Sequence, residues 1–596
     1  MRDVATLFSP SRLHAVLALA LALAACRGEK NERAEKAAAR PAPAPATSLE
    51  ASLRKRQLSN VIAYIPPACF AKTRASGVEP ARNPCYVCHG GSMAPNYNDD
   101  EDLQTTLTFP SAAADDPWKN LVAPAVLRAP KTTDDDVLRR VRANNYAAAD
   151  GSPLLAKALA SPPDEWDIDG DHAWGGYVPD AGLVFDDHGF DHRADGSETG
   201  WRAFAYFPFP GAFFPTNGST DDVLIRLPRR FQTDDRGAVD RVVYEVNLAV
   251  VEALVTRADV PIDPVDESAL GVDLDRDGAL ARAARVTFDA DARSPETTRM
   301  QYVGEAGAEQ RAGRLAIAPG LFPLGTEFFH TVRYLDVGGD GVVGMARRMK
   351  ELRYAKKVAY LDYATLRGRA ALDAREVLAS RDGARHVNWL GERGIDNGQG
   401  WIFEGFIEAK DGALRPQSRE ETVYCAGCHG GIGATTDSIF SFPRKLGGEA
   451  LARGWFHWSQ HDLRGVPEPR TSDGAYEYTE YLARAGAGDD FGANAEVLAR
   501  FFDDRHQPRP RELEALHADV TRLLLPSPAR ALDLDRAYMA VVDTQAFALG
   551  RDAVLAPAQD VYTTVPLGES TGIRAPVAVA RLVRAERVAR TRGTQK

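Results

Sequence analysis

The stretch "NPCYVCHGG" occupies residues 83–91, and "YCAGCHGG" occupies residues 424–431. Each holds two cysteines separated by two residues, with a histidine directly after the second cysteine. The chain has 596 residues and six cysteines, so two copies of one pentapeptide use four of the six. The copies begin at Cys85 and Cys425, 340 positions apart. Such a repetition in a cysteine-poor chain indicates a defined chemistry.

Cys-x-x-Cys-His is the attachment sequence of c-type haem. Two thiols bond to the two vinyl groups on one edge of the porphyrin, and the adjacent histidine ligates the iron as its proximal ligand. The sequence therefore predicts two covalently bound haem c groups as cofactors. Their ligands are Cys85, Cys88 and His89 for the first haem, and Cys425, Cys428 and His429 for the second.

Three other interpretations of the pentapeptides are weaker. A thioredoxin-like Cys-x-x-Cys motif does not explain a following histidine in both copies, and the flanking sequence shows no clear βαβ pattern. A zinc site would require the two copies to converge or to recruit further ligands. Structural disulfides between such close cysteines are uncommon. Cys69 has no assigned role, and a buried thiol is the simplest explanation for it.

The N-terminus carries an export signal. Arg2 and Arg12 precede the apolar run "AVLALALALAAC" at residues 15–26, which is too short to span a bilayer. The ending "LAAC" resembles the lipobox of bacterial lipoproteins, which implies lipidation of Cys26. Arg27 follows, and by the same resemblance this favours the outer membrane of the cell envelope, facing the periplasm or the exterior. A soluble secreted protein is the alternative.

Composition and texture divide the chain into six parts, with an α+β fold in which helical, loop-rich haem regions flank a mixed, β-rich middle region. The parts are a lipoprotein signal peptide (1–25), a disordered tether (26–48), a first haem c region (49–160), a mixed α/β insert (161–420), a second haem c region (421–560) and a basic C-terminal tail (561–596).

Local patterns predict individual elements. "TTDDDVLRRVRANNYAAA" (residues 132–149) has apolar residues at helical spacing. "RVVYEVNLAVVEALV" (residues 241–255) suggests β-structure. Residues 344–380, from "GMARRMKEL" to "DAREVLAS", are strongly helical in residue type.

The sixth position on each iron decides whether a haem only carries electrons or also does chemistry. His330, in "GTEFFHTVRY", lies among aromatic and apolar residues and is a candidate distal ligand. His457, in "GWFHWSQHDL", is a second candidate because it follows His429 at a distance from which the chain could return over the haem. The alternatives are a satisfied core histidine for His330 and a surface helix for His457.

Alternating aspartates form two candidate calcium loops, because carboxylates at every second position converge on a hard cation. The first loop holds Asp273, Asp275 and Asp277 in "DLDRDG", but Ala284 stands where an EF-hand needs glutamate. The second holds Asp167, Asp169 and Asp171 in "DWDIDGDHAWGG". Solvated acidic turns are the alternative at both places.

Two haem motifs in an exported chain resemble a dihaem c-type cytochrome. Dihaem peroxidases, their MauG-like relatives and rubber oxygenases share this feature, although the wide spacing here departs from the peroxidases. "NGQGWIFEGFIE" and "CHGGIGATTDSIFSFPRKL" resemble a family of bacterial dihaem lipoproteins. The likeness to dihaem cytochromes implies an electron-transfer protein with redox partner proteins in the periplasm or at the cell surface, whereas the likeness to the lipoprotein family implies no particular reaction.

Three functions therefore remain open. The first is a lipid-anchored dihaem cytochrome that passes single electrons, and the second is a dihaem peroxidase or oxygenase with one catalytic and one relay haem. The third is a calcium-stabilised surface binding module with structural haems. The formal net charge of −11 argues against nucleic acid as a partner, and contact with the membrane is expected through the lipid anchor alone.

Overall fold

A computed structural model describes residues 60–72, 85–88, 94–96, 109–211, 215–291, 294–379, 387–447, 453–461, 463–471, 474–486 and 488–565. It leaves out the side chains of residues 85–86 and 373–379. The predicted signal peptide, tether and lipidated Cys26 lie outside the described residues, as do His89 and the tail beyond residue 565. The described residues belong to one compact unit that begins at Ser52.

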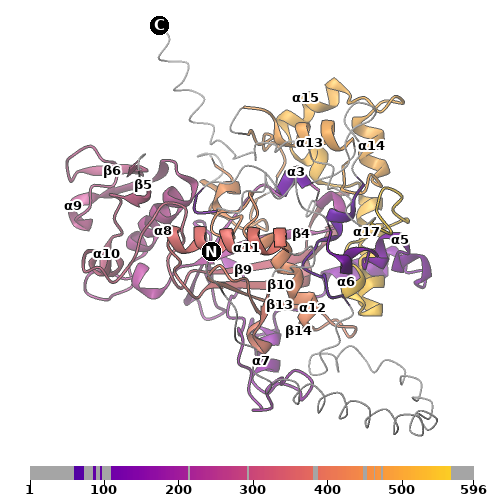
Figure 1. Ribbon diagram of the computed structural model, residues 1–596, viewed down its shortest axis with the longest axis horizontal. Helices are drawn as coiled ribbons and strands as arrows, with labels where there is room; N and C mark the ends of the chain where they lie inside the picture. The colour runs from indigo at the N-terminus through magenta and orange to yellow at the C-terminus, as the bar shows by residue number, and fades with distance from the viewer. Residues whose placement is uncertain are drawn as a thin grey trace, which may run out of the picture. The chain divides into compact units, whose positions relative to one another are not determined.

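A ten-stranded sheet, antiparallel at every pairing, organises the described part of the chain (Figure 1). In spatial order its strands are β1 (Val184–Phe185), β2 (Phe190–His192), β3 (Glu198–Phe204), β4 (Thr220–Arg226), β9 (Glu327–Val337), β10 (Val343–Lys357), β13 (Trp401–Glu408), β12 (Ile395–Asp396) and β11 (Asn388–Trp389), and β14 (Leu414–Pro416) also pairs with β13. Two small hairpins stand apart from this sheet: β5 (Val260–Asp266) with β6 (Arg282–Val286), and β7 (Ala290–Asp291) with β8 (Ser294–Thr298). All these strands come from the predicted β-rich middle region, and together with the helices they confirm the α+β fold class.

The helices precede, interrupt and follow the sheet in sequence. They are α3 (Cys85–Cys88), α5 (Lys119–Val122), α6 (Asp134–Arg142), α7 (Leu154–Leu159), α8 (Arg241–Thr256), α9 (Glu267–Leu270), α10 (Gly304–Arg311), α11 (Tyr363–Ala379), α12 (Arg419–His429), α13 (Glu477–Ala485), α14 (Ala495–Phe501), α15 (Pro510–Ala518), α16 (Thr521–Leu524) and α17 (Pro528–Thr544). α6 confirms the helix predicted within residues 132–149; its N-cap Thr133 accepts a hydrogen bond from the Asp136 amide. α17 packs on α6 and on β9, and α12 packs on β13 (Figure 1).

The run at residues 241–255, predicted as β-structure, forms helix α8 instead. α8 starts at Asp240, whose side chain accepts a hydrogen bond from the Val243 amide, and ends at Arg257 in the left-handed conformation. From Val246 to Val255 every side chain of this helix is buried. A helix buried on all sides lacks the single apolar stripe of a surface helix. The prediction was wrong because a short apolar run does not distinguish a buried helix from a strand.

Residues 344–380, predicted as one helical stretch, divide between strand β10 and helix α11. β10 pairs with β9 along one edge and with β13 along the other. Its charged side chains have partners: Arg348 lies 2.7 Å from Glu408, and Arg353 lies 2.9 Å from Glu351. Pairing on both edges overrides the helix propensity of these residues, so the helical prediction was wrong for the first half and confirmed for α11.

The largest group of buried apolar side chains includes residues of both α8 and α12, so the second pentapeptide is anchored in the core. Tyr424 and Cys425 belong to this group, and the Trp118 ring packs edge-on against Tyr424 at 5.7 Å between centroids. The backbone that carries the second motif is therefore fixed by packing.

Candidate functional site

The second pentapeptide occupies the C-terminal half of α12. The helix begins with a capping box: Ser418 Oγ accepts a hydrogen bond from the Glu421 amide (3.4 Å), and the Glu421 carboxylate accepts one from the Ser418 amide (2.7 Å). Arg415 donates two further hydrogen bonds to Glu421, at 2.9 and 3.0 Å. This capped start fixes the helix that places Cys425, Cys428 and His429 over its last turns.

His429 is oriented by a backbone carbonyl. Its Nδ1 lies 2.8 Å from the carbonyl oxygen of Ser438, and its ring packs against Phe403 and Phe440 with centroids 4.7 and 5.2 Å away. Burial lowers the pKa of His429 to about 4, against the raising effect of the Ser438 carbonyl. The imidazole is therefore neutral, and with Nδ1–H donating to Ser438, Nε2 keeps its lone pair. A metal-ligating histidine is commonly held in this way.

A tight turn presents the Ser438 carbonyl to His429. Thr436 and Ile439 exchange two backbone hydrogen bonds, and the two residues between them, Asp437 and Ser438, have φ of 52° and 65°. Such left-handed conformations are unfavourable for non-glycine residues. The buried Lys357 donates a hydrogen bond to the Asp437 carboxylate, which also accepts one from the Phe322 amide at 2.9 Å. The buried ion pair thus holds the turn in place.

Two amide side chains hold the end of α12 from the other side. Asn397 donates to the carbonyl oxygen of His429 at 2.9 Å, and Gln399 donates to that of Gly430 at 2.9 Å. Gln399 also accepts a hydrogen bond from the Ser438 hydroxyl at 2.9 Å. The stretches "NGQGWIFEGFIE" and "CHGGIGATTDSIFSFPRKL" therefore meet around His429. Both stretches stand out in the sequence, but the sequence alone does not predict the contacts between them.

The two pentapeptides lie next to each other despite their separation in sequence. The carbonyl oxygen of Cys88, in α3, accepts a hydrogen bond from the Ala434 amide at 3.0 Å. Asn96 donates to the Ile432 carbonyl at 2.6 Å and to the Thr435 hydroxyl at 3.3 Å. The loop that follows the second motif thus binds the backbone of the first motif at Cys88 and the side chain of Asn96.

Both motifs border one cavity of about 180 Å³. Cys88 and Cys428 line it, and so does Cys69, which has no role assigned from the sequence. Gly427 lies against residues 60–72, the first described segment of the chain. A Cβ on Gly427 would stand 2.2 Å from the Tyr64 carbonyl oxygen and 2.8 Å from Pro66. Only glycine allows this close approach.

Arginines form one part of the cavity lining. Arg353 and Arg551 share the Glu351 carboxylate, at 2.9 and 3.2 Å. The Arg551 guanidinium also stacks over the Tyr424 ring, 4.3 Å from its centroid. Arg530 lines the cavity too, and the buried Nε atoms of Arg530 and Arg551 find no hydrogen-bond partner among the described residues.

Carboxylic acids form another part of the lining, namely Asp489, Asp490 and Asp552. Burial raises the pKa of Asp490 to about 8, and the neighbouring Asp489 adds to the rise. Burial raises the pKa of Asp552 to about 6, although Arg551 opposes the shift. Asp490 and Asp552 therefore gain and lose a proton near neutral pH. In its protonated form each carboxyl group donates a hydrogen bond into the cavity.

The thiols of the second motif are protonated rather than activated. Burial raises the pKa of the Cys425 thiol, and it raises that of Cys428 to about 11. A thioredoxin-like motif instead has a thiol of lowered pKa. The described residues contain three groups of metal-ligating side chains, and Cys88, Cys425 and Cys428 belong to none of them. The raised thiol pKa values disfavour the redox-disulfide interpretation.

The two candidate distal histidines have different surroundings. His330, on β9, is in register with Arg353 of β10, and its Nε2 lies 3.2 Å from Asp221. His330 is also among the groups that lower the pKa of His429, after burial.

His457 uses both ring nitrogens within the protein. Nε2 lies 2.6 Å from the Asp222 carboxylate and Nδ1 lies 2.7 Å from the Ser459 hydroxyl. Its ring stacks on Phe185, 4.5 Å away. Both ring nitrogens of His457 are therefore engaged within the protein, as Nε2 of His330 is by Asp221, and a distal role stays a prediction for both histidines.

Each aspartate loop meets a glutamate that the sequence did not indicate. Carboxylate oxygens of Asp167, Asp169 and Glu392 lie within 4.8 Å of one another, and so do those of Asp273, Asp275 and Glu267. Asp171 and Asp277 lie outside these groups; each accepts a hydrogen bond from a backbone amide two residues on. The carboxylates of Glu392 and Glu267 also accept hydrogen bonds from backbone amides of their loops. Calcium at either loop stays a prediction.

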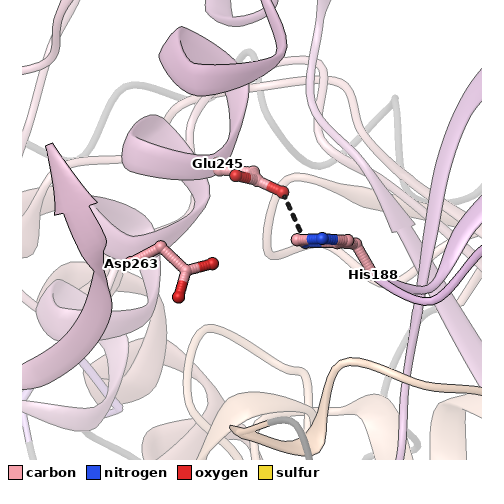
Figure 2. Close-up of side chains that lie close together, drawn as sticks. All are labelled: His188, Glu245 and Asp263. Atoms are coloured by element: carbon pink, nitrogen blue, oxygen red, sulfur yellow. Dashed lines mark ion pairs between the residues drawn. The ribbon is translucent and has the colours of Figure 1, made fainter.

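A third cluster consists of His188, Glu245 and Asp263 (Figure 2). His188 Nδ1 lies 3.3 Å from Glu245 Oε1, and the Asp263 carboxylate faces the gap beside that pair. Arginines already neutralise the carboxylates: Arg202 lies 3.6 Å from Glu245, and Arg453 lies 3.0 Å from Asp263. These arginines would repel a cation.

Comparisons with known proteins place the chain among lipoproteins. A protein-family model described as "-like lipoprotein" matches residues 53–518. An uncharacterized lipoprotein from Aquifex aeolicus (strain VF5) is 30% identical over 551 residues, which are 85% of this chain and 88% of the relative. No solved structure matches the chain. None of the helices in the described ranges is long and apolar enough to cross a membrane. The chain belongs to this lipoprotein family.

Proposed function

We propose that this lipoprotein is a dihaem c-type cytochrome that transfers single electrons between periplasmic or surface redox partners. One haem would be held by Cys85, Cys88 and His89, and the other by Cys425, Cys428 and His429. The observation that carries the proposal is the orientation of His429, whose Nδ1 is tied to the Ser438 carbonyl at the end of a helix that Cys425 anchors in the core. A neutral His429 ring held in one orientation is what iron ligation requires, and a motif that bound no haem would not require it.

The residues around the thiols suit a covalent haem. Each protonated thiol would add across a porphyrin vinyl group, forming an S–C bond while its hydrogen goes to the other vinyl carbon. The buried Nε atoms of Arg530 and Arg551 find no partner within the described part of the chain, and these N–H groups would donate to haem propionates. The haem iron supplies a one-electron couple, and the chain supplies its ligand, its orientation and its low-polarity surroundings.

The sixth coordination position separates carrier from enzyme. His330 is the distal ligand of this proposal, because it is among the groups whose charge influences His429. With a histidine on each side, an iron is low-spin and passes electrons without binding substrate.

The second candidate function is a dihaem peroxidase or oxygenase, and one observation favours it. Asp490 and Asp552 line the cavity with pKa values of about 8 and about 6. A reaction with peroxide or oxygen needs a group that delivers protons near the iron, and these acids would provide it.

The location of the protein extends the proposal. The family assignment makes it a lipoprotein, and we place the lipid on Cys26 and the folded part in the periplasm or at the cell exterior, at the outer membrane. Its electron donor and acceptor would then be other proteins of the envelope.

A resting-state electron paramagnetic resonance spectrum and a single-turnover mixing experiment test the proposal on the haem-loaded, full-length protein. We expect a low-spin signal from the iron held by His429 and no reaction with one equivalent of hydrogen peroxide in the half-reduced state. A high-spin signal that disappears on addition of peroxide, with a new optical intermediate, would replace the carrier function by the enzyme.

A further inference from the structure

We infer that a second, smaller cavity, beside β11 and β13, binds a primary ammonium group, which is either the free ammonium ion or the head of a small amine. Trp166, Trp174 and Trp389 line this cavity, and so do Glu404 and Gln417. None of its lining residues belongs to a pentapeptide. The inference therefore goes beyond the proposed function and requires no haem.

The cavity has room for one small group. Its volume is about 10 Å³, which is the space that a single water-sized sphere needs. Glycines create this space: a Cβ on Gly405 would stand 2.1 Å from Gln417 Oε1, and a Cβ on Gly394 would stand 2.8 Å from Glu404 Cγ. An ammonium ion and the head of a primary amine are close to water in size, whereas a tetramethylammonium ion is much wider. The space therefore suits an ammonium head without substituents.

The three tryptophans stand on the solvent side of the cavity. Each of them is half-buried, whereas Glu404 and Gln417 are 4% and 3% exposed. Trp174 is fixed by its Nε1, which donates a hydrogen bond to the Tyr177 carbonyl at 3.0 Å, and by packing against Phe406. Tryptophan is the aromatic side chain that attracts a cation most strongly. A cation can thus enter beside aromatic rings, and the stem of an amine would extend back toward solvent.

Two buried acceptors lie at the inner side. Gln417 Nε2 donates a hydrogen bond to the Glu351 carboxylate at 3.3 Å, which orients the amide, and Gln417 Oε1 finds no donor among the described residues. A buried acceptor without a donor is costly. The Glu404 carboxylate accepts a hydrogen bond from the Tyr177 amide at 2.5 Å. An ammonium group has several N–H donors, so it would satisfy Gln417 Oε1 and bind Glu404 at the same time.

The charge of the lining also favours a cation. Glu392 and Glu404 line the cavity, and no arginine, lysine or histidine does so within the described ranges. The Glu392 carboxylate accepts hydrogen bonds from the amides of Ile168 and Gly175, at 2.9 and 2.6 Å, so it contributes charge more than a free acceptor. Burial raises the pKa of Glu404 to about 7, which shows that nearby positive charge does not compensate this carboxylate. A bound ammonium group supplies the missing charge.

Isothermal titration calorimetry of the full-length protein at constant ionic strength tests the inference. The probes are the chlorides of ammonium, propylammonium, potassium and tetramethylammonium, each replacing sodium chloride. We expect ammonium or propylammonium to bind at one site, and potassium and tetramethylammonium to give no heat beyond dilution. Glu404→Gln keeps an acceptor for the Tyr177 amide but removes the charge, and it should weaken binding about tenfold or more. Trp389→Phe keeps a smaller ring and should weaken binding about threefold.

Asp169→Asn is the control, because Asp169 lies close to Glu392 in the neighbouring aspartate loop but does not line the cavity. This variant should bind ammonium as the parent protein does. If ammonium binds and propylammonium does not, the ligand is the free ion; if both bind, it is an amine head, and either result supports the inference.

Three results would overturn the inference. One is the absence of binding for both ammonium and propylammonium. Another is potassium binding as tight as ammonium binding, since the site would then not select a hydrogen-bond donor. The third is loss of binding in Asp169→Asn but not in Glu404→Gln, which would assign the cation to the aspartate loop. If Glu404→Gln does not fold, Trp389→Phe takes its place in this comparison.

Discussion

His429 Nδ1 lies 2.8 Å from the carbonyl oxygen of Ser438, nine residues further along the chain. That carbonyl is presented by a turn with two left-handed residues, Asp437 and Ser438. The buried Lys357, at the end of β10, holds this turn by donating a hydrogen bond to the Asp437 carboxylate. The orientation of the proposed haem ligand thus rests on a strand more than seventy residues away in the sequence.

Lys357→Met should reduce the free energy of unfolding by about 3–5 kcal/mol, because it leaves the Asp437 carboxylate buried without its counter-ion. Lys357→Met/Asp437→Leu should recover most of that loss, since both charges are then removed. Lys356→Met is the matched control: Lys356 is 44% exposed and lies 3.5 Å from Glu327, and its loss should cost at most about 1 kcal/mol. Urea unfolding measures all three. A double variant no more stable than the single one would contradict the account of this turn.

His330→Ala and His457→Ala should have opposite signatures. His330→Ala should convert one low-spin haem to high-spin with little change in stability, because it removes the proposed distal ligand. His457→Ala should leave the haem spectra unchanged and cost about 1–3 kcal/mol, because Asp222 loses a buried hydrogen-bond partner. Electron paramagnetic resonance and chemical unfolding of both variants check this. A spin change in His457→Ala alone would reverse the assignment.

Asp490→Asn should stabilise the protein more at pH 8 than at pH 5. The folded-state pKa of Asp490, about 8, is above its ordinary value of 3.8, so the folded state binds more protons than the unfolded state between those values. Stability from this group is therefore present at low pH and is lost as pH rises toward 8. Asparagine removes that loss.

Asp503→Asn is the control for this pH dependence. Asp503 is exposed, and backbone hydrogen bonds to Gln507 and Arg505 lower its pKa, so it does not titrate between pH 5 and 8. The difference in unfolding free energy between the two pH values should match that of the parent protein. An equal difference in Asp490→Asn would show that Asp490 is not a buried, protonated acid.

Calcium should raise the melting temperature of the metal-depleted protein if either aspartate loop binds it. Glu392→Gln and Glu267→Gln each remove one carboxylate from a loop and should each reduce that shift. Glu245→Gln alters the third cluster, in which arginines neutralise the carboxylates, and should leave the shift unchanged. Thermal unfolding with and without calcium checks this. An identical melting temperature in both conditions would leave the loops as solvated acidic turns.

Sequence and structure agree where a local pattern is sufficient. The α+β class, the helix within residues 132–149 and α11 follow from spacing and propensity. α8 and β10 were predicted wrongly, because burial on all sides hides the period of a helix and pairing on both edges overrides helix propensity.

The site shows the same division. The two motifs are visible in the sequence, whereas their adjacency, the role of Gln399 and the glutamates Glu392 and Glu267 depend on tertiary packing. Each of these contacts joins residues that are at least six positions apart in the sequence, and no local spacing rule predicts them. The asparagine and glutamine of "NGQG" indicate that polar contacts form there. They do not indicate which carbonyl oxygen each side chain binds.

Intact-mass spectrometry of the denatured, full-length protein, produced in a host that attaches haem c, tests the central claim most directly. Thioether bonds survive denaturation, so the account predicts a mass increase of two haems for the parent protein and for Cys69→Ala. It predicts one haem for Cys425→Ala/Cys428→Ala. A parent protein that carries no covalent haem, or a cysteine double variant that carries as many haems as the parent, would contradict it.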